Sequence, residues 1–188
     1  VAGVDALIGS TGYTGEYGYE LYFDANHAET VWNAILEAGK PDGVKPIGLA
    51  ARDSLRFEPC LPLYGHELGP DITPLEAGLG FFVKTDKGDF VGRDALLKQR
   101  LEQPPRKLVC LEMIDKGVPR EHYEVVADGQ SGFVTSGMFA PTVGAYVAMA
   151  LLPREVAEIG REVDVMIRGK AKKAKIVKRP FYTPAYRR

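Results

Sequence analysis

A pair of prolines at positions 104 and 105 divides this sequence of 188 residues into two parts with different hydrophobic patterns. Before the prolines, glycine-rich turns alternate with segments in which apolar residues recur at helical spacing. After them come short runs rich in β-branched residues and separated by turn residues, a pattern typical of a small β-barrel or sandwich. The sequence therefore predicts an α+β chain whose two parts meet near residue 104.

Three helices are expected before the prolines, because apolar residues recur there every three to four positions. They cover residues 26–40, 46–59 and 92–103. In the first helix, Asn26 followed by Glu29 predicts an N-terminal cap, and Gly39 predicts the end. Two strands around a glycine-rich turn are expected within residues 4–24, and a further strand over residues 81–87.

The overall charge argues against two classes of partner. A formal net charge of −1 gives no field that would attract nucleic acid or a membrane surface. No apolar run is long enough to span a bilayer. The lysine-rich run over residues 168–179 is interpreted as a solvated edge strand, with a nucleic-acid patch as the alternative. The sequence predicts neither a nucleic-acid nor a membrane partner.

Cysteine and histidine usage gives little sign of a metal site. Cys60 and Cys110 are far apart in the sequence and are interpreted as reduced thiols rather than as a disulfide or metal ligands. The histidines share no metal-ligand spacing, so no metal is expected; they are His27, His66 and His122. His66 is a candidate acid or base, and the alternative is a loop histidine bonded to the backbone.

The stretch GYTGEYGYELYF, residues 12–23, contains several glycines although a strand is expected here. Side chains alternate between the two faces of a strand, which predicts a core face made of Tyr17, Tyr19, Leu21 and Phe23. Glu20 would lie on the other face beside Gly18, and the missing side chain of this glycine leaves room for a flat group against the backbone. Alternatively, Gly18 marks a bulge and Glu20 faces solvent.

Two arginines four residues apart add a second candidate feature. Arg52 and Arg56 project from the same side of the second expected helix, and like charges at this spacing are mildly destabilising. One of them is therefore expected to meet a carboxylate, a phosphate or a polar ligand. Asp53 can pair with Arg56, which leaves Arg52 for a ligand; a structural salt bridge for Arg52 is the alternative.

Six motifs, taken together and in order, resemble the C-terminal half of the glycine cleavage system T-protein family, the aminomethyltransferases. They are TGYTGEYGYELYF, GLAARDSLRFEPCLPLYGHEL, ITPLEAGLGFFVK, DFVGRDALL, GFVTSGMFAPTVGAYVAMALLP and RGKAKKAKIVKRPFY. The resemblance covers nearly the whole chain. It departs from the usual family pattern at Tyr17, where an aspartate is common, and at residues 58–60, where EPC replaces a common EAG.

The resemblance implies three domains around a central folate channel. Residues 1–103 would be the C-terminal part of the folate-binding domain, and residues 104–188 the C-terminal β-barrel domain. The intact protein would take an aminomethyl group from the lipoyl-carrying H-protein, release ammonia and pass the one-carbon unit to tetrahydrofolate. The family's catalytic aspartate lies in the N-terminal half. The chain is therefore expected to be a fragment with no catalytic residue, inactive by itself, and partnered by that missing half and by the H-protein.

Four positions match the folate-binding residues of the family: Glu20, Arg52, Tyr13 and Tyr186. A carboxylate can accept hydrogen bonds from the ring N–H and the exocyclic amine of a pterin, which suits Glu20. The Arg52 guanidinium can donate to the pterin carbonyl oxygen. Tyr13 offers a ring face and a hydroxyl, and Tyr186 lies beside two arginines that favour the carboxylates of the benzoylglutamate tail.

Two other functions remain as alternatives. The chain could be the folate-binding domain of an enzyme that demethylates sarcosine or dimethylglycine, although the dinucleotide-binding glycine fingerprint of its flavin domain is absent here. It could also be a non-catalytic folate-binding module. A related iron–sulfur assembly protein is discounted because KGDFVGRD lacks the cysteine of that relative's motif. A bacterial or archaeal cytoplasm is expected, with the mitochondrial matrix as the alternative.

Overall fold

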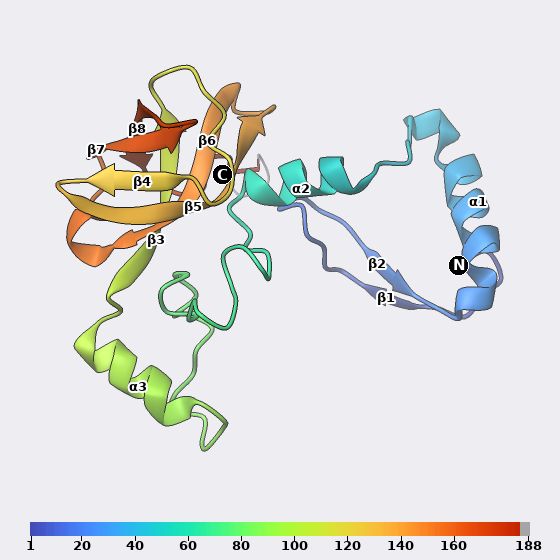
Figure 1. Cartoon of the computed structure of the whole chain (residues 1–188). Coiled ribbons are helices and arrows are strands. Elements are labelled where there is room, and N and C mark those ends of the chain that lie inside the picture. Colours follow the sequence, from blue (N-terminus) through green and yellow to red (C-terminus); the bar gives the residue numbers. More distant parts are fainter. Residues whose placement is uncertain (185–188) are drawn as a thin grey trace.

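The computed structural model describes residues 1–184 as an extended N-terminal arm, a small helical lobe and a closed β-barrel (Figure 1). In the arm, two short strands pair antiparallel and two helices follow: β1 (Leu7–Gly9), β2 (Glu20–Tyr22), α1 (Ala28–Ala38) and α2 (Leu49–Phe57). Helix α3 (Arg93–Glu102) forms the lobe that leads into the barrel. Each of the three expected helices is therefore present.

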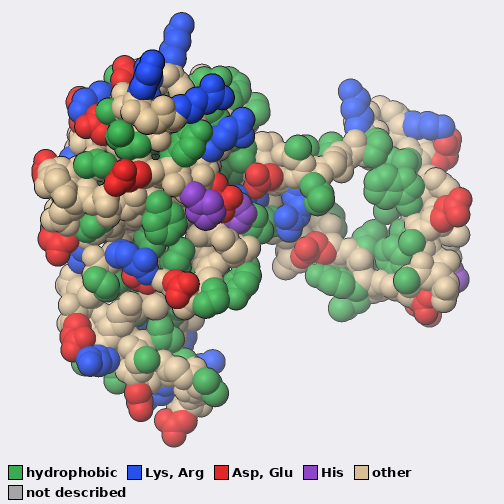
Figure 2. Space-filling view, viewed as in Figure 1, with side chains coloured by type: hydrophobic (Ala, Val, Ile, Leu, Met, Phe, Trp, Pro, Cys, Tyr) green, Lys and Arg blue, Asp and Glu red, His purple; other side chains and the backbone are tan. Residues whose placement is uncertain are grey.

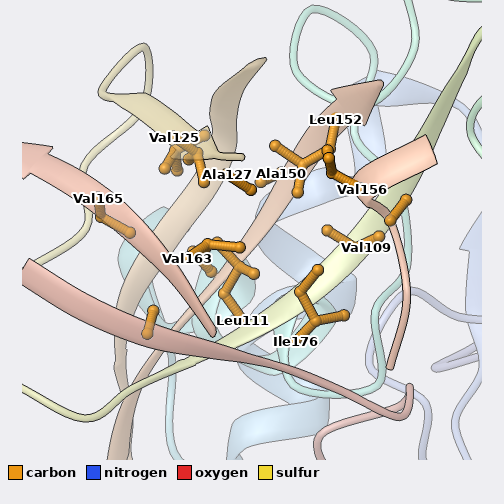
Figure 3. Close-up of a cluster of buried hydrophobic side chains, with 14 residues drawn as sticks. Val109, Leu111, Val125, Ala127, Ala150, Leu152, Val156, Val163, Val165 and Ile176 are labelled. Atoms are coloured by element: carbon orange, nitrogen blue, oxygen red, sulfur yellow. The ribbon is translucent and has the colours of Figure 1, made fainter. Parts of the chain in front are cut away.

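Six antiparallel strands close into the barrel in the order β3-β6-β5-β4-β7-β8. Their bounds are β3 (Arg106–Met113), β4 (Glu124–Ala127), β5 (Gln130–Ala140), β6 (Ala145–Pro153), β7 (Glu162–Ile167) and β8 (Lys170–Val177). Alanine, valine, leucine and isoleucine side chains from all six strands fill the interior (Figure 3). The predicted fold class is confirmed, and the barrel, not the sandwich, is the arrangement that forms.

The lysine-rich segment was expected to be an edge strand, and this prediction is wrong. Strand β8 pairs with β3 on one side and with β7 on the other, so closure of the barrel leaves it no free edge. Alternation still puts Lys173 and Lys175 outward, while Ala174 and Ile176 point into the core. Lys173 forms an ion pair with Asp164 of the neighbouring strand, at 2.9 Å.

Two local predictions in the first part are also wrong. Asn26 does not cap α1; its backbone N–H is instead bound by the side chain of Asp24, which begins a short 3-10 turn ahead of the helix. The expected strand over residues 81–87 is absent because this segment turns on itself. The backbone N–H of Phe82 bonds to the carbonyl of Leu79, three residues back, which is turn geometry.

The expected core face of the arm is not buried within the described residues. Strand β2 is only three residues long, and Tyr17 and Tyr19 lie before it with 82% and 74% of their surface exposed. Helix α1 buries only Val31, while Trp32 remains 53% exposed. Hydrophobic side chains line the inner side of the arm in the space-filling view (Figure 2). Strand pairing begins only at Glu20, so the alternation argument does not apply to the two tyrosines before it.

Helix α2 connects the arm to the barrel. Its last residue, Phe57, is completely buried against a second apolar cluster. This cluster lies on the outer side of the barrel wall, because its members alternate along β3 and β6 with the residues that fill the interior. Within residues 1–184, none of the helices is long and apolar enough to cross a membrane.

Candidate functional site

A pocket of about 460 Å³ lies in the arm, between the glycine-rich turn and the start of α2. Tyr13 and Gly18 come from the turn, Glu20 from the first position of β2, and Arg52 from the first turn of α2. Apolar groups from residues 47–49 complete the wall. The structure thus brings together three of the four predicted folate-binding residues. Tyr186 lies outside the described residues.

The carboxylate of Glu20 is oriented by one strong hydrogen bond. The Thr11 hydroxyl donates to Glu20 Oε2 over 2.5 Å, and the Tyr22 hydroxyl lies 3.4 Å from the same oxygen. Within residues 1–184, Oε1 of Glu20 has no hydrogen-bond partner. The side chain is exposed, so this oxygen is available to a donor that enters the pocket.

Arg52 has no ion pair within residues 1–184, so its N–H groups are available to a ligand. Its guanidinium carbon lies 4.6 Å from the centre of the Tyr13 ring, a cation–π contact that positions the group. The hydroxyl of Tyr13 donates to the carbonyl oxygen of Pro62. Burial raises the pKa of this phenol above its ordinary value. Tyr13 therefore presents its ring to the pocket, and its hydroxyl anchors the turn.

Gly18 leaves open space beside Glu20. A Cβ atom built at this position meets no other atom within 4 Å, so the described chain itself does not require glycine here. The same is true of Gly12, on the opposite part of the turn. A flat ligand could approach the backbone at both places.

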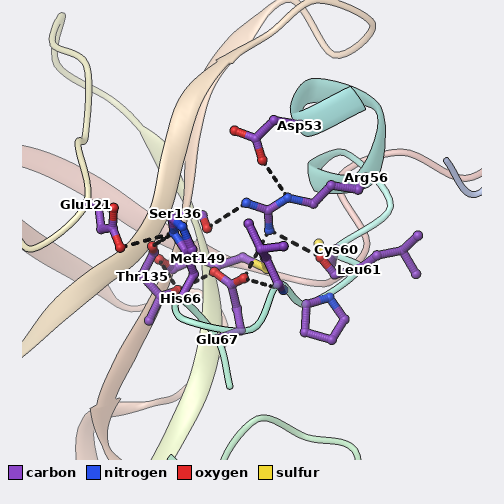
Figure 4. Close-up of polar contacts among 12 residues, drawn as sticks. Asp53, Arg56, Cys60, Leu61, His66, Glu67, Glu121, Thr135, Ser136 and Met149 are labelled. Carbon is purple, nitrogen blue, oxygen red and sulfur yellow. Dashed lines mark hydrogen bonds and ion pairs between the residues drawn. The ribbon is translucent and has the colours of Figure 1, made fainter. Parts of the chain in front are cut away.

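Arg56 has a structural role that differs from that of Arg52. Its guanidinium is 1% exposed and bonds to Asp53 at 2.7 Å, as expected, and to the fully buried Glu67 at 3.0 Å (Figure 4). It also donates to the Ser136 hydroxyl of β5. Glu67 in turn accepts hydrogen bonds from the Leu63 amide and from Thr135. This network fixes α2, and with it Arg52, on the barrel wall.

His66 is bonded to the backbone, in agreement with one of the two interpretations from the sequence. Its Nδ1 lies 3.1 Å from the carbonyl oxygen of Thr135 and 3.1 Å from the carboxylate of Glu121. Both neighbours are acceptors, so Nδ1 carries the hydrogen. His66 also lines a separate cavity of about 490 Å³, next to the barrel. Within residues 1–184, no cluster of side chains could hold a metal ion.

Each of the two parts of the chain matches the model of a known protein family. The family model for the GCVT N-terminal domain matches residues 1–87, and that for the glycine cleavage T-protein C-terminal barrel domain matches residues 106–183. The chain belongs to the glycine cleavage T-protein family. The resemblance inferred from the six motifs is confirmed.

Individual T-protein relatives agree with this assignment. The aminomethyltransferase of Caldanaerobacter subterraneus subsp. tengcongensis is 57% identical over 189 residues, covering 100% of this chain and 50% of that protein. That of Desulfitobacterium hafniense is 57% identical over 97% of this chain and 50% of its own length. The crystal structure of glycine cleavage system aminomethyltransferase T from Bartonella henselae superposes with a TM-score of 0.88 and 34% identity, over 95% of this chain and 50% of that one. The chain spans about half the length of the relatives it matches.

The buried network around Arg56, which supports the pocket of Glu20 and Arg52, was not predicted from the sequence. The pair of Asp53 and Arg56 was identified because the two residues are three positions apart on one helix. Glu67 and Thr135 were not identified, since they come from a loop and a distant strand that meet only in the folded chain. The only sequence signal was a glutamate within a loop rich in proline and glycine.

Proposed function

We propose that this chain forms the tetrahydrofolate-binding portion of an aminomethyltransferase of the glycine cleavage system. The whole enzyme would accept the aminomethyl group carried on the lipoyl arm of the H-protein. It would release ammonia and transfer the one-carbon unit to tetrahydrofolate. Family membership supports the reaction class, and the pocket around Glu20 and Arg52 supports the role of this portion.

One observation carries the proposal: within residues 1–184, a carboxylate oxygen without a hydrogen-bond partner and a guanidinium without an ion pair line the same pocket beside an open glycine surface. A pterin edge presents two adjacent N–H donors next to a carbonyl acceptor. Glu20 would accept from the donors and Arg52 would donate to the carbonyl, both as charge-assisted hydrogen bonds. Gly18 would admit the ring system, and the Tyr13 ring would hold the guanidinium in place.

The exposed apolar side of the arm supports a second element of the proposal. Trp32, Ile8 and Leu7 are 53%, 53% and 71% exposed, although an isolated hairpin and helix gain most of their stability from burying such groups. The relatives are about twice as long as this chain. We propose that the remaining portion of a T-protein packs on this side, completes the folate channel and supplies the catalytic group. This portion and the H-protein are the proposed partners.

The activity can be tested with the protein at its natural length. Aminomethylated H-protein and tetrahydrofolate are supplied, and methylenetetrahydrofolate and ammonia are measured. The Arg52→Met variant should lower kcat/KM for tetrahydrofolate at least tenfold, since a charged hydrogen bond contributes about 1.5–3 kcal/mol. Arg168→Met, an exposed arginine in the turn after β7, is the matched control and should behave as the unaltered protein.

Two results would contradict the proposal. Failure of the unaltered protein to form either product would refute the aminomethyltransferase reaction. Full activity of Arg52→Met, at tetrahydrofolate concentrations below KM, would leave the reaction in place but refute the assignment of this pocket.

A further inference from the structure

The two cysteines of the chain, 50 positions apart in sequence, meet in the folded structure. Cys60 Sγ lies 3.4 Å from Cys110 Sγ, and both are reduced. Cys60 follows the end of α2, and Cys110 lies in β3 on the outer wall of the barrel. A disulfide has an S–S distance of about 2.05 Å, so the two sulfurs need to approach by only about 1.4 Å.

The backbone around Cys60 is arranged as in a helix end that favours glycine. The amide of Cys60 bonds to the carbonyl of Phe57, and the amide of Leu61 bonds to that of Arg56, which is the Schellman pattern. Cys60 has a φ of +60°, a conformation that glycine adopts without penalty and other residues adopt at a cost. A cysteine at this position therefore carries a conformational cost, and its side chain is directed at the only other thiol of the chain.

The surroundings of the pair give the two sulfurs different reactivity. Cys60 is partly exposed, whereas Cys110 is 2% exposed. The hydrogen bond from Cys110 is the main cause that lowers the pKa of Cys60, and a backbone hydrogen bond and the nearby Arg179 also lower it. The same contact with Cys60, together with burial, raises the pKa of Cys110. Cys60 is thus the nucleophile, because the thiolate is the reactive form.

We propose that Cys60 and Cys110 are a reversible oxidation site, at which a low-molecular-weight disulfide converts the two thiols into a disulfide between α2 and the barrel. The Cys60 thiolate attacks one sulfur of the small disulfide, forms a mixed disulfide and releases one thiolate. Cys110 then loses its proton and attacks Cys60 Sγ, which releases the second thiol. Two electrons from the cysteines reduce the small disulfide to two thiols. Attack by Cys110 becomes easier after the first step, because Cys60 is no longer the thiolate that raised its pKa.

The bond would attach Cys60, just after the end of α2, covalently to β3. The last turn of α2 carries Arg56 and Phe57, which already hold the arm against the barrel through a hydrogen bond to Ser136 of β5 and through apolar contact. Oxidation is therefore expected to preserve the fold and to raise the melting temperature by about 5–10 °C, since the bond closes a long loop of the unfolded chain. This inference does not depend on the proposed folate function.

The test exposes the folded protein at its natural length to oxidised glutathione, followed by alkylation, proteolysis and mass spectrometry. The expected product is a peptide pair joined through Cys60 and Cys110, with a loss of two hydrogens, a raised melting temperature and full reversal by dithiothreitol. In the Cys110→Ala variant, the reaction should stop at glutathione attached to Cys60. In the Cys60→Gly variant, which keeps the preferred backbone conformation, Cys110 should remain unmodified.

Three outcomes would overturn the inference. Stable glutathione attachment at Cys60 in the unaltered protein would show that Cys110 cannot reach it. A joined peptide pair that forms only after denaturation would show that the native geometry does not support the bond. Equal attachment at Cys110 in the Cys60→Gly variant would refute the assignment of Cys60 as the nucleophile.

Discussion

Replacing Arg56 with methionine should strongly destabilise the protein, because Arg56 is the counter-ion of a completely buried carboxylate. Its guanidinium lies 3.0 Å from Glu67 Oε2, and the two side chains are 1% and 0% exposed. Breaking such a pair by removing one partner costs about 3–5 kcal/mol. Ser136 and the carbonyl of Leu61 also lose a donor. For a chain of this size each kcal/mol lowers the melting temperature by about 2–4 °C, so a drop of about 6–20 °C is expected.

Urea unfolding at neutral pH, with the midpoint and slope recorded separately, measures the effect. Arg52→Met is the matched control, because it removes an exposed arginine from the same helix and should change stability by only about 0.5 kcal/mol. The double variant Arg56→Met/Glu67→Gln should recover part of the loss, since it removes the unpaired charge. A loss below about 1 kcal/mol for Arg56→Met, typical of a surface pair, would refute the view that this network holds α2 on the barrel.

Two further predictions follow from contacts at the barrel. Burial raises the pKa of Glu76, but hydrogen bonds from Arg106 and Thr73 outweigh it, so the pKa lies below the ordinary value. The stabilising effect of this carboxylate is therefore present above its unfolded pKa of about 4.3 and is lost as the pH falls through the lower folded value. Urea unfolding of Glu76→Gln should show a smaller loss of stability on acidification than the unaltered protein, and an unchanged acid dependence would contradict this. In β5, a Cβ at Gly137 would lie 1.8 Å from the carbonyl oxygen of Pro119. Gly137→Ala should thus lower the melting temperature by several degrees, and a neutral result would show that the strand can move away.

The barrel and helices could be predicted from the sequence because their signals are local. Periods of two and of about 3.6 residues are visible in one segment at a time. The length of β2 could not be predicted in this way. Tyr17 and Tyr19 alternate correctly with Leu21, but strand pairing begins only at Glu20, so the two tyrosines have no sheet to place them. Closure of the barrel by β8 could not be predicted either, since it depends on pairing with β3, which is far away in the sequence.

The candidate site was predictable where family motifs mark it and not where distant segments meet. Glu20, Arg52 and Tyr13 line one pocket, as their motif positions suggested. The contact between Cys60 and Cys110 could not be seen, because 50 positions separate the two residues. Glu67 was missed for the same reason: its partners belong to a helix and to a barrel strand.

The most direct test of the account is the tetrahydrofolate affinity of the Glu20→Gln variant, measured by calorimetry on the protein at its natural length together with its melting temperature. The amide oxygen of the glutamine can keep the hydrogen bond from Thr11, which places the NH₂ group at the position of Oε1 in the wall of the pocket. That donor would meet the donors of the pterin, a mismatch that costs about 2 kcal/mol. The account predicts a Kd at least tenfold higher with little change in melting temperature, while Glu29→Gln on the exposed side of α1 changes neither. An unchanged Kd with a lowered melting temperature would contradict the account, because Glu20 would then be structural.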